Sequence, residues 1–107
     1  MRQLNFDLKT LQARHREGAF NTRRDRAYVL DQAAHMLHAL GFRRLRATGL
    51  KRKHVNALVA EWQRRGLATG TVKNRMAHLR WLAKKVGKPG IVRRDNASYG
   101  VGARYAA

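Results

Sequence analysis

The residues that could carry out chemistry in this chain are six acids and five histidines, and they are scattered along it. General acid–base catalysis needs convergent carboxylates in perturbed surroundings, and no such pair is apparent. His35 and His38 share one predicted helix face at a spacing that could chelate a metal ion. With no cysteine and few nearby carboxylates, however, the ligand set would be hard to complete. No glycine-rich phosphate loop is present, so the sequence predicts no catalysis, no metal site and no cofactor.

Positive charge is what the chain has in excess. It holds 24 Lys and Arg against 6 Asp and Glu in 107 residues, a formal net charge of +18. Self-repulsion at this charge opposes the compact state unless a polyanion relieves it. Nucleic acid is therefore the predicted partner, far ahead of an anionic membrane surface. No apolar run is long enough to span a bilayer and no signal peptide is apparent, so we expect a soluble, cytoplasmic protein without a small-molecule substrate. The same repulsion predicts a monomer in isolation.

The element on which this charge converges is a predicted helix over residues 69–87, which contains no acidic residue. We expect Thr69 or Thr71 to cap its start and Gly87 to end it. One apolar stripe can be buried, and a cationic flank lies beside it. Lys73 and Asn74 are of types that contact phosphates and base edges, near a helix start that could enter a major groove. The stripe comprises Val72, Met76, Leu79, Leu82, Ala83 and Val86; the flank comprises Lys73, Arg80 and Lys84.

The sequence leaves the roles of two residues of this helix open, the aromatic Trp81 and the basic Arg75. Trp81 points nearly opposite the apolar stripe. Its ring either fills a second buried contact face or lies exposed against a nucleic-acid backbone or a partner. Arg75 borders the stripe and could make either a structural hydrogen bond or a DNA contact.

Apolar periodicity predicts three earlier helices. The first spans residues 7–16, with Asp7 as its N-cap and Phe6 on its apolar edge. The second runs from Thr22 to Gly41, with a capping-box-like start formed by Thr22 and Asp25. The third spans residues 51–65, and its Trp62 is expected in the core.

Basic residues gather at two of these helix starts. Arg23, Arg24 and Arg26 lie in the first turn of the second helix, against the preference for acids at that end. A phosphate docked there would reverse the penalty. Lys51 and Lys53 begin the third helix. After residue 88 the helical period stops, and a proline with several glycines indicates a linker. We therefore expect a helical domain over residues 1–88 and a linker over residues 89–107.

The order and spacing of several short motifs resemble a known family. The chain resembles the N-terminal, core-binding, SAM-like domain of phage-type integrases of the tyrosine recombinase family. The resemblance covers most of residues 20–98. It is carried by Thr22-Arg23, Leu40-Gly41-Phe42, His54-Val55, Trp62, Gly66-Leu67, Gly70-Thr71 and Leu79-Arg80-Trp81.

The resemblance implies an all-α bundle of four to five short helices, arranged as two crossed helical hairpins, with a flexible C-terminal tail. That domain forms half of a clamp around duplex DNA at the recombination core site, in a bacterial, nucleoid-associated protein. The implied oligomer forms only in the synaptic complex of the full-length recombinase. The implied DNA contacts are Arg23, Arg24, Arg26, Lys51, Lys53, Lys73, Asn74 and Arg80.

The family's catalytic residues lie in a separate C-terminal domain, and their motifs are missing from this sequence. No His is followed by Arg at the third position, and Tyr99 and Tyr105 fall in the expected linker. We therefore expect a fragment that is not itself an enzyme.

Two other functions remain open at this point. The charge would also suit a free-standing RNA-binding protein, although no aromatic platform is apparent. A protein-interaction module that docks a helix on the face of Trp81 is the second alternative.

Overall fold

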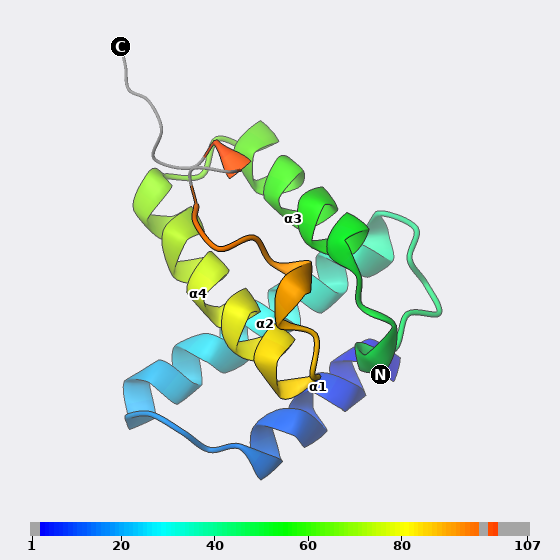
Figure 1. Cartoon of the computed structure of the whole chain (residues 1–107), viewed down its shortest axis with the longest axis vertical. Helices are drawn as coiled ribbons and strands as arrows, with labels where there is room; N and C mark the ends of the chain where they lie inside the picture. Colours follow the sequence, from blue (N-terminus) through cyan, green and yellow to red (C-terminus); the bar gives the residue numbers. More distant parts are fainter. Residues whose placement is uncertain (1–2, 97–98, 101–107) are drawn as a thin grey trace. The chain divides into compact units, whose positions relative to one another are not determined.

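The computed structural model describes residues 3–96 and 99–100, and within them the chain is helical, without a strand (Figure 1). The predicted all-α fold is confirmed. Residues 97–98 and 101–107, which belong to the expected linker over residues 89–107, lie outside the described part. The elements in chain order are α1 (Gln3–Arg14), α2 (Phe20–Ala39), the short 3-10 helix η1 (Ala47–Gly49), α3 (Arg52–Arg64), α4 (Thr69–Lys85) and the 3-10 helix η2 (Pro89–Ile91).

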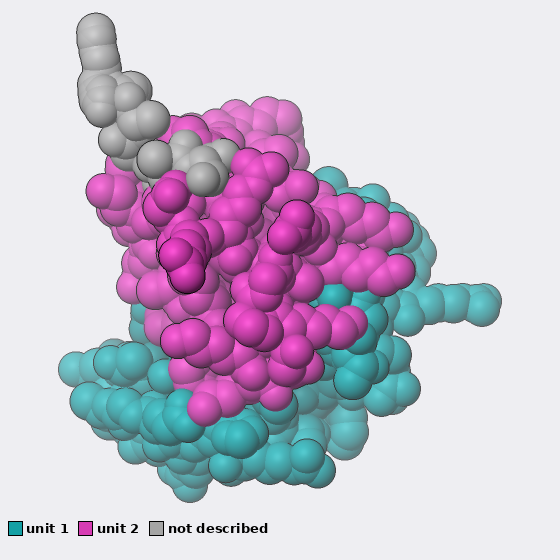
Figure 2. Space-filling model, viewed as in Figure 1, with its two compact units in different colours: residues 1–50 teal, residues 51–107 magenta. Residues whose placement is uncertain are grey.

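The chain forms two compact units, residues 1–50 and residues 51–107 (Figure 2). In the first unit α1 packs on α2 and contacts η1. In the second unit α3 packs on α4, and η2 contacts both helices. Each unit is therefore a helical hairpin with one short 3-10 helix against it.

The first unit is held together by apolar side chains from both of its helices. Leu4 and Leu8 of α1 are buried, as are Val29, Leu30 and Leu37 of α2. The apolar face of α2 is buried along most of its length, whereas Leu40, the residue after the helix, is 41% exposed. Phe6 was expected on the apolar edge of α1, and that prediction is wrong because the ring is 55% exposed.

The second unit has the more regular core. Trp62 is 1% exposed, which confirms its predicted place in the core. It shares the apolar stripe of α3 with three other buried residues, and the predicted stripe of α4 is buried except for the half-buried Val86. Val92, which follows η2, is also buried. The remaining core residues are Val55, Leu58 and Val59 from α3 and Val72, Met76, Leu79, Leu82 and Ala83 from α4.

The helix ends after α2, α3 and α4 fall where the glycines predicted them. Gly41, Gly66 and Gly87 all have positive φ angles, which a residue without a Cβ adopts without strain. In each case the glycine N–H and the next N–H turn back onto carbonyls of the last helical turn, as in Gly66 N to Gln63 O at 3.0 Å and Leu67 N to Trp62 O at 3.2 Å. This is the Schellman arrangement, which satisfies carbonyls that the helix leaves free.

The helix starts differ from the predictions. Helix α2 begins at Phe20 and is preceded by Ala19, and α4 begins at Thr69 and is preceded by Ala68; neither alanine offers a side-chain cap. Thr22 was expected to cap α2, and Thr69 or Thr71 to cap α4, but all three threonines lie inside the first turn of their helix. The predictions were wrong because helical φ and ψ extend past the threonines, and intrinsic capping preference is too weak to prevent this.

Asp7 was expected to cap the first helix, and it lies inside α1 instead. Its carboxylate accepts two hydrogen bonds from the Arg46 guanidinium, at 2.8 and 2.9 Å, and one from the Ala47 backbone N–H at 3.0 Å. The hydrogen bonds from Arg46, with the Ala47 N–H and the charge of Arg46, lower the pKa of Asp7 despite its partial burial. The carboxylate thus fastens η1 to α1, a tertiary role that overrides its local preference.

Candidate nucleic-acid interface

The three arginines at the start of α2 have different environments. Arg24 is exposed, Arg23 is half-buried, and Arg26 is buried at 5% exposure. The Arg26 guanidinium donates to the Glu17 carbonyl oxygen at 3.2 Å and so holds the connection between α1 and α2 against the helix. The burial of Arg26 could have been predicted from the sequence, because Arg26 precedes Val29 and Leu30 by three and four residues and so lies on the same, buried face of the helix. We therefore assign Arg26 a structural role and keep Arg23 and Arg24 as candidate contacts.

The start of α3 displays three consecutive exposed cations, Lys51, Arg52 and Lys53. Behind them His54 is 3% exposed, and its Nδ1 accepts the Lys51 backbone N–H at 2.9 Å. Burial, together with the charges of Lys53, Lys51 and Lys88, lowers the pKa of His54. The neutral ring therefore caps the helix end that presents the cations.

Helix α4 presents the polar face that the sequence predicted. Lys73 and Asn74 are exposed near its start, and Arg80 is half-buried in its second half. Lys73, Arg80 and Lys84 are seven and four residues apart, a spacing that places them on one side of a helix. A helix of 17 residues is about 25 Å long, so this side can follow a nucleic-acid backbone over several phosphates.

The two ambiguous residues of α4 both contact other side chains. The Arg75 guanidinium lies over the Trp62 ring, 5.3 Å from its centroid, and this packing is its observed role. Trp81 is half-buried, with the Lys85 ammonium 5.8 Å from its ring centroid. Trp81 therefore has neither a fully buried nor a fully exposed ring.

The segment after α4 brings further cations to the same helix. A hollow of about 560 Å³ in the second unit is lined by five cationic side chains, and no acid is among its lining residues. Arg80 donates to the Arg93 carbonyl oxygen from Nε at 3.3 Å and from Nη2 at 3.0 Å, and Arg52 Nε donates to the Gly90 carbonyl oxygen at 3.0 Å. The cations are Arg52, Arg80, Lys84, Arg93 and Arg94.

Three of these five residues were not predicted from the sequence. Arg93 and Arg94 belong to the expected linker, and Arg52 lies between two predicted contacts. The described residues after Lys88 pack against α3 and α4: η2 contacts both helices, Gln63 Nε2 donates to the Tyr99 carbonyl oxygen at 2.8 Å, and the Arg93 N–H donates to the Tyr99 hydroxyl oxygen at 2.9 Å. In the sequence, only the adjacent arginines Arg93 and Arg94 indicated a possible anion contact. Two neighbouring charges do not reveal that the segment packs against α4.

Of the two acids in the second unit, Glu61 lies near the end of α3, whereas Asp95 directly follows Arg94, which lines the hollow. Glu61 near the end of α3 accepts hydrogen bonds from Arg64 and Arg65, which lower its pKa to about 2. Two cations at that end are thereby locally compensated, whereas the residues that line the hollow include five cations and no acid. Like charges held together in this way form a focus of positive potential that favours an anion.

The structure adds two observations on other kinds of site. Among the residues it describes, no three His, Asp or Glu side chains form a group that could hold a metal ion; His35 Nε2 instead lies 3.3 Å from Asp31 Oδ2. None of the helices in that part of the chain combines the length and the apolar character needed to cross a bilayer.

Comparison with known proteins gives one match. A family model described as "Phage integrase, N-terminal" matches residues 1–92, which is most of the chain. Neither a search of the curated proteins nor one of the solved structures gave a match.

Proposed function

The chain belongs to the phage integrase N-terminal family, and on that premise we propose that it grips duplex DNA at a recombination core site and positions a separate catalytic domain. Residues 1–88 would form the DNA-binding domain, and residues 89–107 would lead toward the catalytic domain. The chain itself would do no chemistry. The observation that carries the proposal is the cationic side of α4, which continues into the acid-free hollow formed with residues 89–94.

Phosphate neutralisation would supply most of the affinity. The candidate phosphate contacts in the second unit are Lys51, Lys53, Lys73 and Arg80, joined by the newly placed cations of the hollow. Arg23 and Arg24 are the candidates in the first unit. Each neutralised phosphate adds about 0.9 to the slope of log affinity against log salt concentration. Six contacts would therefore lower the affinity steeply, by about a thousandfold, between 50 and 200 mM salt.

Base reading would be limited in this arrangement. Asn74 is the one amide among the candidate contacts, and asparagine can pair with the major-groove edge of adenine. It is exposed one residue after Lys73, so a phosphate contact by the lysine would hold the amide near base edges.

The experiment is a salt series with three labelled ligands: a duplex containing a core-site-like sequence, a random duplex and an RNA hairpin. We expect duplex binding with a steep salt slope and a preference for the core-site-like duplex that survives higher salt. Preference for the RNA hairpin, or loss of all duplex binding at physiological salt, would contradict the proposal.

Two substitutions assign the binding to α4. Lys73→Gln and Arg80→Gln are each expected to weaken duplex binding and to reduce the salt slope by about 1. The matched control is Arg65→Gln, which removes one charge next to the Glu61 carboxylate, and it should leave affinity nearly unchanged. Equal losses in all three variants would mean that only total charge matters.

A further inference from the structure

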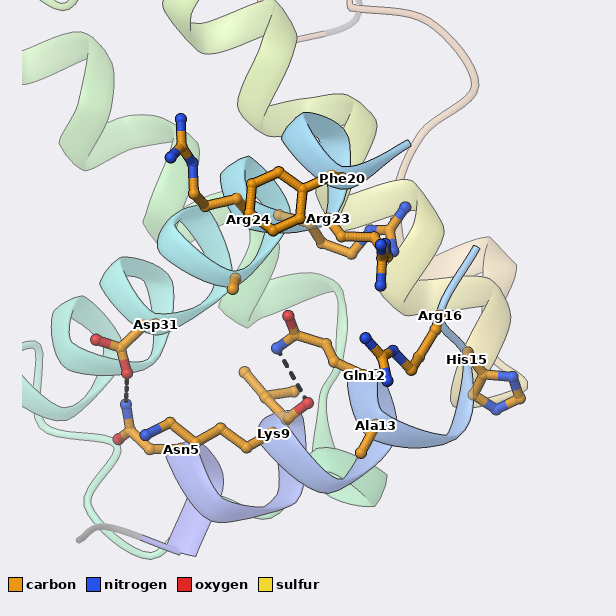
Figure 3. A pocket seen from close by; sticks show the side chains of 13 residues that line it. Asn5, Lys9, Gln12, Ala13, His15, Arg16, Phe20, Arg23, Arg24 and Asp31 are labelled. Carbon is orange, nitrogen blue, oxygen red and sulfur yellow. Dashed lines mark hydrogen bonds between the residues drawn. The ribbon is translucent and has the colours of Figure 1, made fainter. Parts of the chain in front are cut away.

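Helices α1 and α2 of the first unit enclose an open cavity of about 440 Å³ (Figure 3). This volume lies in the range of small-ligand sites. Its walls come from residues 5–13 of α1, the connection after this helix and residues 20–31 of α2. All residues that line the cavity belong to the first unit, and Arg23 and Arg24 among them are also the candidate duplex contacts of that unit.

The cavity wall is strongly cationic. Five of its lining residues are Lys or Arg, and its one acid, Asp31, already accepts the Asn5 amide at 2.7 Å. In Figure 3 the Arg16 and Arg23 side chains extend into the space between the two helices. The remaining cations of the wall are Lys9, Arg24 and Arg26.

Two of these cations, Arg23 and Arg26, have environments that favour binding of an anion. Arg26 is 5% exposed and fixed by its bond to the Glu17 carbonyl, so the wall carries an immobile positive charge. Arg23 Nε is buried and has no hydrogen-bond acceptor in the described part of the chain. Buried donors normally have an acceptor, and a phosphate offers several oxygens that guanidinium groups bind strongly.

An aromatic ring adjoins this charge. Phe20 lines the cavity although its side chain is 63% exposed, and the Arg24 guanidinium lies 5.6 Å from its ring centroid. Tyr28, eight residues further along α2, is also exposed at 57%. Inorganic phosphate alone gains nothing from an exposed ring, whereas a nucleobase stacks on one.

We propose that this cavity binds a single nucleotide, with its phosphate between Arg16 and Arg23 and its base against Phe20. The nucleotide can be free or can be an unpaired residue of a nucleic-acid strand, because both present the same phosphate and base. The site is additional to the duplex-binding surface of α4.

The test is an amide chemical-shift titration of the ¹⁵N-labelled chain with AMP, adenosine and inorganic phosphate. We expect AMP to shift the amides of residues 12–26 and to bind at least about tenfold more tightly than either of the other two. AMP binding no tighter than phosphate, or shifts spread equally over the cations of both units, would overturn the proposal.

Variants separate the two halves of the site. Arg23→Gln should weaken both AMP and phosphate, whereas Phe20→Leu should weaken AMP about tenfold and leave phosphate unchanged. Arg65→Gln, with the same loss of charge in the second unit, should change neither. Equal effects of Arg23→Gln and Arg65→Gln on AMP would refute the site, and unchanged amide shifts of residues 32–50, in the same unit but away from the substituted positions, would show that the variants fold.

Two DNA ligands identify the source of the nucleotide. A duplex with a one-nucleotide overhang is compared with the same duplex carrying an abasic overhang. If Phe20→Leu lowers affinity only for the intact overhang, the cavity takes an unpaired nucleotide of DNA; if it lowers affinity only for AMP, the cavity takes a free nucleotide. AMP binding without duplex binding would support the nucleotide site and contradict the proposed function. Duplex binding without AMP binding would support the proposed function and contradict the nucleotide site.

Discussion

Arg24 and Arg26 illustrate how residues two positions apart on α2 acquire different roles. Arg24 is exposed with its guanidinium over the Phe20 ring, whereas Arg26 is buried with its guanidinium on the Glu17 carbonyl oxygen. We expect Arg26→Gln to lower the free energy of unfolding by about 1–3 kcal/mol, because it breaks a buried hydrogen bond and leaves a cavity. Arg24→Gln should change it by no more than about 0.5 kcal/mol. Urea unfolding of both variants measures the difference, and equal stabilities would contradict the assignment.

His54 makes stability depend on pH in a defined direction. Its pKa is lowered in the folded chain, by burial first and by Lys53, Lys51 and Lys88 next, from an ordinary value of 6.5. The folded state therefore binds the proton less well than the unfolded state. The contribution of the neutral ring to the free energy of unfolding is complete above pH 6.5. It is lost as the pH falls below that value toward the lowered pKa. The expected result is a free energy of unfolding that decreases as the pH falls below 6.5.

A variant isolates this contribution from that of the other histidines. His54→Gln keeps an oxygen acceptor at the third position of α3, which suits the Lys51 N–H, but it does not titrate. Its stability should fall less than that of the original chain over the same pH range, as measured by thermal unfolding at each pH. Parallel pH profiles would show that His54 is not responsible.

Two glycines test how backbone conformation affects stability at helix ends, because Gly66 has a positive φ and Gly70 does not. Gly66 after α3 has φ +72°, and a Cβ there would meet nothing within 4 Å, so backbone strain alone opposes a side chain. We expect Gly66→Ala to destabilise by about 1–2 kcal/mol. Gly70 lies in the first turn of α4 with equally open surroundings and no positive φ. Gly70→Ala should therefore stabilise by about 0.4–1 kcal/mol. Changes of the same sign in the two variants would contradict the explanation.

Across the whole molecule, the net charge of +18 opposes folding and self-association alike. Because the Debye length shortens from about 10 Å at 0.1 M salt to about 3 Å at 1 M, we expect added NaCl to screen the repulsion and raise Tm. A short DNA duplex should raise Tm further at low salt, since a ligand that binds the folded state stabilises it. Sedimentation in low salt should give a monomer. A fall in Tm with added salt would indicate that attractive ion pairs dominate instead.

The amino-acid sequence was enough to predict the helical fold, the glycine-terminated helix ends and most of the buried stripes, because these follow from local periodicity and from backbone conformations that favour glycine. It also determined the excess charge and, through short motifs, the family that the match over residues 1–92 shows. Helix starts were predicted poorly, because capping preferences differ by little free energy and Asp7 found a stronger tertiary partner in Arg46. Only the tertiary structure separated Arg26 from Arg24, and only it brought Arg93 and Arg94 beside Arg80 and placed Phe20 at a cationic cavity. These relations depend on which side chains meet after the chain folds back, and sequence spacing does not contain that information.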